Sequence, residues 1–228
     1  MGTRSTMMPL WHVMRGGIVT DNLEAEWRFD EGAGASVEDH VGSANLTIGG
    51  SGSDWVSGGL EFNGAAYAQN ATAPVLAPPP LTHVICCYLD PGAVAGLTYI
   101  MDGGNATARH VLGDDNGGGH THDLLMSGGT ILYGGANTTP IGKWVILTVI
   151  FNGASGIVYD GVTELMSGDV GTRTLDGITL AARYTLASFM PYAIWGYHLI
   201  YTAALTPAQI SKNNDAITAI MAQRGVAV

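Results

Sequence analysis

Short segments of strand-like sequence recur along the whole chain, and clusters of Gly, Asn and Asp separate them. The 228 residues include 33 glycines, which allow the positive backbone φ angles that tight turns need. These glycines follow no Gly-x-y period, so they indicate frequent chain reversals rather than a collagen-like repeat. We therefore expect one all-β domain, because sandwiches and barrels of this length commonly remain single.

The clearest strand is predicted over residues 24–30. Its apolar residues Ala25, Trp27 and Phe29 alternate with charged residues, which is the period-two pattern of a strand with one buried face. The spacing of the remaining segments is typical of a β-sandwich. Further strands are expected at residues 55–56, 60–63, 83–89, 97–101, 124–126, 131–133, 143–151, 156–159, 178–181 and 193–201.

The strand expected over residues 143–151 is apolar on both faces. Only one face can line a sandwich core, so the other face needs a cover. A helix predicted over about residues 207–224 is one candidate, with Thr206 as its cap and Pro207 at its first position. The N-terminal arm and a neighbouring subunit are the other candidates. One face would carry Trp144, Ile146, Thr148 and Ile150, and the other Val145, Leu147, Val149 and Phe151.

Residues 1–20 show neither helical nor strand periodicity, so we divide the chain into an N-terminal arm, residues 1–20, and a domain, residues 21–228. The apolar content of the arm exceeds what a solvated tail needs. We expect the arm to dock on another subunit through a set of apolar side chains, namely Met7, Met8, Leu10, Trp11 and Val13.

Charge and hydropathy argue against two classes of partner. The formal net charge is −10, and such a field repels a polyanion, so no nucleic-acid partner is expected. The longest plain apolar run is far shorter than the roughly 18 to 20 residues that span a bilayer, so no membrane partner is expected. Pro9 and His12 interrupt the apolar stretch near the start, which does not favour a secretory signal.

The two cysteines, Cys86 and Cys87, are adjacent in an expected strand. Their side chains should point to opposite faces, where an ordinary disulfide between them would be strained. This arrangement favours folding in a reducing compartment.

Several blocks occur in the order found in one family. Residues 27–34 (Trp-Arg-Phe-Asp-Glu-Gly-Ala-Gly), 55–64, 142–153, 158–161 and 200–210 resemble successive motifs of laminin-G-like, concanavalin-A-like jelly rolls. The resemblance covers about residues 23–212. It implies an all-β, concanavalin-A-like jelly-roll β-sandwich, here with an N-terminal arm and a short C-terminal helix. This fold carries lectins, adhesive modules, glycosidases, lyases and virion proteins, so it leaves the function open.

Enzymatic activity is not expected. Glu24 and Glu26 on one strand would stand roughly 7 Å apart, within the range of about 5 to 9.5 Å that glycosidases use. They lack the E-x-D-x-x-E run of laminarinase-like enzymes, and we interpret them as part of a solvated strand face. The sequence contains no nucleophile elbow, P-loop, zinc spacing or dinucleotide fingerprint, so no cofactor is expected apart from an optional Ca²⁺.

The most polar part of the sequence lies between residues 102 and 123, which we interpret as a loop. Its oxygen-bearing side chains are hard ligands of the type that Ca²⁺ prefers, and its histidines could bind a transition metal. The metal candidates are Asp114, Asp115, His120, His122 and Asp123. A saccharide is the other ligand considered, because the same polar groups could accept hydrogen bonds while a ring stacks on the sugar. The glycan candidates are Asp114, Asp115 and Asn116, with Tyr99 or Tyr133 as the ring.

Three functions remain open at this stage. The leading hypothesis is a non-enzymatic structural protein of a bacteriophage virion, either a head-decoration or a tail component, because the fold is usual outside cells and no secretory signal is expected. It would assemble in the host cytoplasm as a homo-oligomer or with other virion subunits, with glycan adhesion as an added role. The alternative is an extracellular lectin, and the third hypothesis is a polysaccharide-cleaving enzyme.

Overall fold

In the part of the chain that the structure describes, the protein is an all-β sandwich of two eight-stranded sheets followed by one α-helix. The computed structural model describes residues 17–89, 97–115, 122–126, 131–136 and 142–228. Its elements are β1 (Leu23–Trp27), β2 (Ser36–Val37), β3 (Leu46–Gly49), β4 (Ser53–Val56), β5 (Gly59–Asn63), β6 (Tyr67–Leu76), β7 (Leu81–Leu89), β8 (Leu97–Gly103), β9 (Val111–Asp115), β10 (His122–Met126), β11 (Ile131–Ala136), β12 (Trp144–Phe151), β13 (Gly156–Asp160), β14 (Thr163–Gly168), β15 (Leu175–Leu180), β16 (Tyr192–Tyr201) and α1 (Pro207–Gln223).

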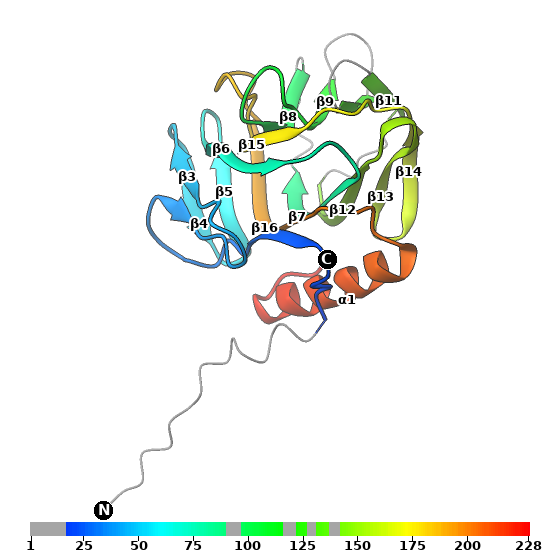
Figure 1. Ribbon diagram of the computed structural model, residues 1–228. Coiled ribbons are helices and arrows are strands. Elements are labelled where there is room, and N and C mark those ends of the chain that lie inside the picture. Colours follow the sequence, from blue (N-terminus) through cyan, green and yellow to red (C-terminus); the bar gives the residue numbers. More distant parts are fainter. Residues whose placement is uncertain (1–16, 90–96, 116–121, 127–130, 137–141) are drawn as a thin grey trace, which may run out of the picture.

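Both sheets are antiparallel throughout the described chain. The first sheet has the order β14-β13-β12-β7-β16-β5-β4. β1 also belongs to it and pairs with the part of β16 that follows the residues paired with β5. The second sheet has the order β11-β10-β9-β8-β15-β6-β3-β2. Figure 1 shows the two sheets stacked, with α1 on the outer side of the first. The expected jelly-roll β-sandwich is therefore confirmed.

The main core lies between the sheets and is filled by large side chains from both. Trp27, Phe62 and Trp195 are fully buried there, together with Phe29 from the segment after β1. The alternating pattern that predicted the first strand correctly identified Trp27 and Phe29, together with Ala25, as core residues. Trp144, in contrast, packs on the other face of the first sheet.

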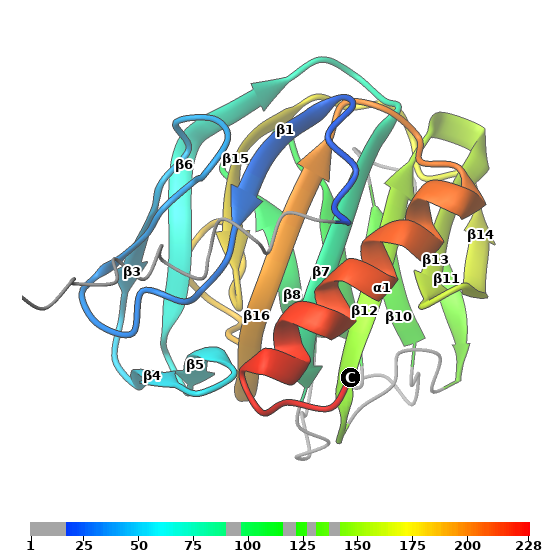
Figure 2. The same ribbon diagram turned by 90° about the horizontal axis from the view of Figure 1, so that it is seen from below.

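The outer face of the first sheet has its own apolar layer, and α1 provides it. Val149 of β12 faces the main core, whereas Ile146 and Ile150 pack with Ile217 and Met221 of the helix. Figure 2 shows α1 lying across β16, β7 and β12. The prediction that both faces of this strand are buried is confirmed, and the cover belongs to the same chain.

The helix begins where the sequence predicts. The Thr206 hydroxyl accepts a hydrogen bond from the Gln209 amide, and the Gln209 side chain accepts one from the Thr206 amide, which together form a capping box. Pro207 occupies the first helical turn, where its missing N–H has no intrahelical partner to lose. Beyond the last turn, Arg224 donates hydrogen bonds to the carbonyls of Arg28 and Gly196, both at 2.9 Å, and so ties the end of the helix to the first sheet.

The segment before β1 is part of the packed domain. Ile18 and Val19 are buried in the layer beneath α1. The Val19 amide donates to Asn213 at 2.8 Å, and its carbonyl accepts from the Tyr201 hydroxyl at 2.9 Å. Residues 18 and 19, which the sequence assigns to the arm, therefore pack with the domain. The five apolar arm residues, Met7, Met8, Leu10, Trp11 and Val13, lie outside the described residues.

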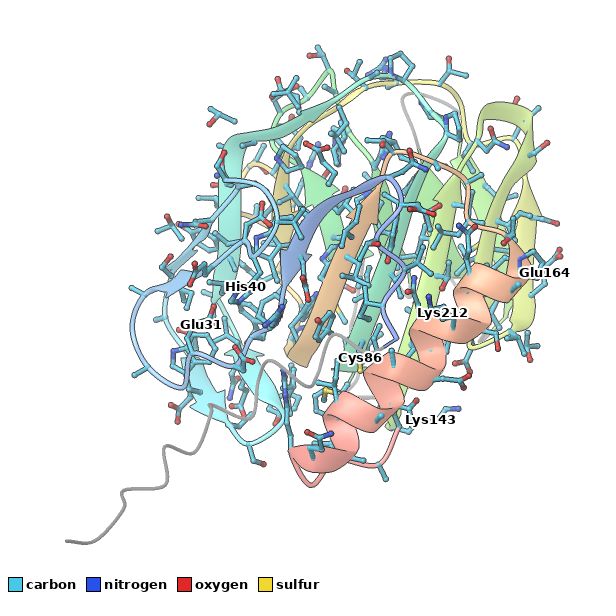
Figure 3. All side chains as sticks on the ribbon, turned by 60° about the horizontal axis from the view of Figure 1, so that its bottom comes forward. Glu31, His40, Cys86, Lys143, Glu164 and Lys212 are labelled. Atoms are coloured by element: carbon cyan, nitrogen blue, oxygen red, sulfur yellow. The ribbon has the colours of Figure 1, made fainter. Side chains whose placement is uncertain are left out.

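Cys86 and Cys87 point to opposite faces of β7, as expected. Cys86 belongs to the layer beneath α1 and Cys87 to the main core, and both thiols are free. Figure 3 shows Cys86 between the helix and the sheet. Burial raises the pKa of the Cys86 thiol to about 12, which makes it a poor nucleophile at neutral pH.

Five strands, β2, β3, β6, β9 and β14, were not predicted. Part of the polar segment interpreted as a loop is instead regular sheet, since Asp102 belongs to β8, and β9 and β10 pair directly. The pairing of Asp115 with His122 and of Asp114 with Asp123 corrects the loop interpretation. The sequence did not predict sheet at these positions, because their polar side chains leave no alternation of apolar and polar residues.

Three histidines are fully buried inside the sandwich. His83 Nδ1 lies 3.2 Å from His198 Nε2, and His110 Nε2 lies 3.0 Å from the Arg173 carbonyl oxygen. The His110 ring also stacks on Phe151 with a centroid distance of 4.1 Å. Burial lowers the pKa of His110 to about 4 and that of His198 to about 3, and it lowers the pKa of His83 well below its ordinary value.

Aspartate on either face of β12 should destabilise the fold. Val149→Asp and Ile150→Asp each place an unpaired charge in a buried apolar layer, and we expect each to lower the free energy of unfolding by about 2 kcal/mol or more. Val162→Asp is the matched control, because Val162 is 66% exposed. Urea unfolding of the three variants checks this, and an unaffected Ile150→Asp would show that α1 does not cover the sheet in solution.

The buried histidines should make the protein sensitive to acid. Their pKa values are lower in the folded chain than in the unfolded chain, so between about pH 6.5 and pH 4 the unfolded chain binds more protons. Each histidine should then reduce the free energy of unfolding by about 1.4 kcal/mol per pH unit as the pH falls through this window. Denaturant unfolding at several pH values measures the slope. His198→Gln should flatten the slope; a slope in this variant equal to that of the wild type would contradict this account.

Candidate functional site

The candidate site lies on the second sheet, on the side of the sandwich away from α1 (Figure 1). We call it the arginine–tyrosine cluster. The strand β8 supplies its Tyr99 and Asp102, and Arg109 precedes β9. The loop of residues 181–190, which follows β15, supplies Arg183 and Tyr184. These five residues come from three parts of the sequence and meet because β8 pairs with both β9 and β15.

Sheet register places Asp102 on the outer face. Met101 pairs with Leu180, and both side chains belong to the main core. The next pair along the strands, Asp102 and Thr179, therefore points away from the core. Thr179 there accepts a hydrogen bond from the Gln69 side chain at 3.0 Å, which continues the polar outer face onto β6.

The Asp102 carboxylate holds the cluster together. Its two oxygens accept hydrogen bonds from Arg109 Nε at 2.8 Å and Arg109 Nη2 at 2.6 Å, which is the bidentate geometry of a strong ion pair. The backbone amides of Gly103 and Tyr184 donate to the same carboxylate at 2.7 and 3.0 Å. Burial raises the pKa of Asp102, although these hydrogen bonds act in the opposite direction. Asp102 thereby fixes the position of the 181–190 loop.

The 181–190 loop is strained. Ala181, Leu186 and Ser188 have φ angles of 61°, 55° and 51°, a region that side-chain-bearing residues rarely adopt. The loop is closed at its base by a hydrogen bond of 2.8 Å from the Met190 amide to the Ala181 carbonyl. Backbone strain of this kind often concentrates at ligand sites, and here it presents Arg183 and Tyr184.

The two arginines of the cluster lie against its two tyrosines. The Arg109 guanidinium carbon lies 5.7 Å from the Tyr99 ring centroid and 4.8 Å from that of Tyr184. The corresponding distances for Arg183 are 6.0 and 5.4 Å, so each guanidinium makes cation–π contacts with both rings. Arg109 is neutralised by Asp102. Within the described chain, Arg183 has no ion pair, and its buried Nε has no hydrogen-bond partner.

Tyr99, expected as a stacking ring for a sugar, lies at the site in a supporting role. Tyr99 is only 5% exposed, and its ring makes cation–π contacts with the guanidinium groups of Arg109 and Arg183. Tyr184 is half-buried and is the ring that a ligand can reach. The sequence analysis missed this residue together with Arg183, although an Arg-Tyr pair is conspicuous in a chain with only 9 basic residues.

Five of the other sequence-predicted residues are placed by their backbone, on strands of the same sheet as the cluster. Tyr133 pairs with Leu124, Leu124 with Gly113 and Gly113 with Tyr99, so both candidate tyrosines share one row across four strands. Asp114, Asp115, His122 and Asp123 occupy the paired ends of β9 and β10. Their side chains, and that of Tyr133, lie outside the described part of the structure, as do Asn116 and His120 entirely.

Among the described side chains, no group of three or more His, Cys, Asp or Glu is arranged to hold a metal ion. The Ca²⁺ and transition-metal sites thus stay predictions, because most of their ligands fall outside that part. The described chain also contains no helix with the length and apolar character needed to cross a bilayer.

The interpretation of Glu24 and Glu26 as a solvated face was wrong for Glu26. Glu24 is exposed, whereas Glu26 is only 1% exposed and accepts hydrogen bonds from Arg28 at 3.0 Å and from the Tyr197 hydroxyl. Burial raises the pKa of Tyr197. The register of β1 against β16 shifts between residues 23 and 25, and Glu26 contacts Tyr197, a residue of the layer beneath α1. Glu26 is therefore a structural carboxylate.

Loss of the Asp102 charge should destabilise the protein and release the loop. Asp102→Asn removes one partner of a buried ion pair, which typically costs about 3 to 5 kcal/mol. The control is Asp160→Asn, which breaks the more exposed pair with Lys143 and should cost less than about 1 kcal/mol. Chemical unfolding measures both. Equal effects of the two substitutions would show that Asp102 does not organise the cluster.

The sequence matches no protein-family model and gives no significant match to a curated protein. Solved structures do share its fold. Trypanosoma rangeli sialidase is 15% identical with a TM-score of 0.63, and the match covers 88% of this chain and 34% of the sialidase. Domain 4 of AbnA, an extracellular GH43 arabinanase from Geobacillus stearothermophilus, solved with arabinotriose, is 20% identical with a TM-score of 0.62; the match covers 85% of this chain and 98% of that domain.

A third similar structure comes from botulinum neurotoxin type C, which is described as interacting with two ganglioside molecules. It is 10% identical with a TM-score of 0.62, and the match covers 91% of this chain and 53% of that one. The present chain spans about a third of the length of the sialidases. At these identities the comparisons establish the fold alone: the chain has the lectin-like jelly-roll β-sandwich that occurs in these glycan-binding and glycan-active proteins.

Proposed function

We propose that this chain is a non-enzymatic, lectin-like module that binds a glycan at the arginine–tyrosine cluster. The observation that carries the proposal is the strained 181–190 loop, which Asp102 anchors and which presents Arg183 and Tyr184 on the outer face of the second sheet. The main core does not require either side chain. Strain held in place by a buried carboxylate is expected where a loop is pre-organised for a ligand.

The cluster offers the two kinds of contact that sugars use. The half-buried Tyr184 ring provides an apolar plate, and the Arg183 guanidinium provides hydrogen-bond donors beside it. We include Asp114, Asp115 and Asn116, which lie on or just after β9 in the sequence, as further hydrogen-bond acceptors for the glycan. Tyr133 lies in the same row of paired residues across the second sheet as Tyr99.

The similar structures support the ligand class. Proteins that contain this fold are described with sialic acid, with arabinotriose and with gangliosides. Three different glycans on one architecture favour a glycan as the ligand here, but they do not select one, because function resides in the site rather than in the fold.

The absence of catalysis is part of the proposal. Glu26 and Asp102 are buried carboxylates, and each is bound to an arginine and to further donors. A carboxylate held in this way keeps the fold together and is poorly suited to exchange protons with a substrate. The glycan-cleaving alternative therefore ranks below binding.

Assembly in a virion stays a prediction. One argument for a covering subunit was the apolar outer face of β12, and α1 of the same chain covers that face. This feature accordingly no longer requires a neighbouring subunit. The lectin reading, which was the second hypothesis from the sequence, becomes the first.

A glycan array followed by calorimetry tests the proposal. The wild-type protein should bind at least one glycan class, and Tyr184→Ala should weaken that binding by about two- to tenfold, since an aromatic contact contributes about 0.5 to 1.5 kcal/mol. Tyr159→Ala, which removes another half-buried tyrosine from the first sheet, is the control and should leave binding unchanged. Repeating the titration with a chelator tests the Ca²⁺ prediction. Absence of binding across the array would contradict the proposed function.

A further inference from the structure

We infer that the ligand of the arginine–tyrosine cluster is an acidic sugar whose carboxylate is bound by Arg183. This inference rests on the proposed function, because it names the class of glycan that the same site would take.

Most cationic side chains of the described chain have a carboxylate or carbonyl partner. Four of them form ion pairs with carboxylates: Arg28 with Glu26, Arg109 with Asp102, Lys143 with Asp160 and Arg224 with Asp30. Arg173 lies near the carbonyls of the 104–110 turn. Within the same described residues, Arg183 and Lys212 have no such partner.

Lys212 and Arg183 differ in their surroundings. Lys212 is exposed on α1, where water solvates its ammonium group. Arg183 is half-buried, and its Nε is shielded from water without a hydrogen-bond acceptor. A cation that is partly desolvated without a counter-charge is unfavourable. The chain contains 19 acidic residues, yet none of those described neutralises Arg183, so we infer that a ligand supplies the missing acceptor.

The guanidinium of Arg183 is already positioned for such a ligand. Tyr99 and Tyr184 contact it, and the hydrogen bond that the Tyr184 backbone amide donates to the Asp102 carboxylate fixes the loop that carries it. Its two terminal nitrogens make no hydrogen bond to the described residues and are not among the buried atoms that lack a partner, and a planar guanidinium fork matches the two oxygens of a carboxylate. Asp102 does not repel an incoming anion, because Arg109 neutralises it.

The net charge of the chain narrows the class of acidic ligand further. A chain with a net charge of −10 repels polyanions over long distances. One carboxylate on an otherwise neutral oligosaccharide feels little of this repulsion at physiological salt, where screening acts over about 8 Å. The site is therefore suited to an isolated sugar carboxylate, as in a sialylated or uronate-containing glycan, and not to a heavily sulfated polymer.

The experiment compares matched glycans by isothermal titration calorimetry at physiological salt. The probes are sialyllactose against lactose, an oligosaccharide with a single uronate against its methyl ester, and heparin as a sulfated polyanion. The proteins are the full chain, Arg183→Gln and Lys212→Gln, which lose the same charge at different places. We expect at least one carboxylate glycan to bind about tenfold or more tighter than its neutral partner. Arg183→Gln should abolish this preference, and Lys212→Gln should keep it.

The outcomes separate this inference from the proposed function. Equal binding of neutral and carboxylate glycans to the wild type would overturn the inference and leave the lectin function standing. A preference that survives in Arg183→Gln would also overturn it, as would tighter binding of heparin than of any carboxylate probe. Absence of binding to every probe and to the glycan array would overturn both. Thermal melting checks the variants; if Arg183→Gln does not fold, Arg183→Lys keeps the charge, and loss of the planar fork should still reduce the preference.

Discussion

The burial of the first sheet on both of its faces is the constraint on which the rest of the molecule depends. β12, β7 and β16 carry large apolar side chains toward the second sheet and also toward α1. Burying each such side chain contributes about 1.5 to 3 kcal/mol, so the helix and residues 18–19 form an essential third layer. This arrangement leaves the outer face of the second sheet as the face that α1 does not cover, and that face is polar where the described residues show it.

The two outer faces therefore have different tasks. Beneath α1, polar groups such as Glu26 and Asn213 are used to join elements of the domain to one another. On the second sheet, Asp102 plays a similar joining role, but the loop that it anchors presents side chains outward. The face that α1 covers thus stabilises the sandwich, and residues on the uncovered outer face of the second sheet can change without loss of the core.

The sequence predicted elements whose signals are local. The alternation of Trp27 and Phe29, the apolar run of β12 and the Thr206-Pro207 start of α1 depend only on neighbouring residues, and all were confirmed. β6 and β14 were missed because they lack alternation and take their place from pairing with β15 and β13. The arginine–tyrosine cluster was missed for a related reason. Asp102 and Tyr184 lie 82 positions apart, and only the pairing of β8 with β15 brings them together.

The position of α1 after every strand of the sandwich affects how the chain matures. The outer layer of the first sheet stays incomplete until Ile217 and Met221 have been synthesised, and the Val19 amide cannot reach Asn213 earlier. Strands that pair sooner would display their apolar outer face while the ribosome is still adding residues, and such faces promote aggregation of incomplete chains. Closure of the domain is therefore a late event in which the last helix shields the sheet and fastens the first residues of the domain in a single step.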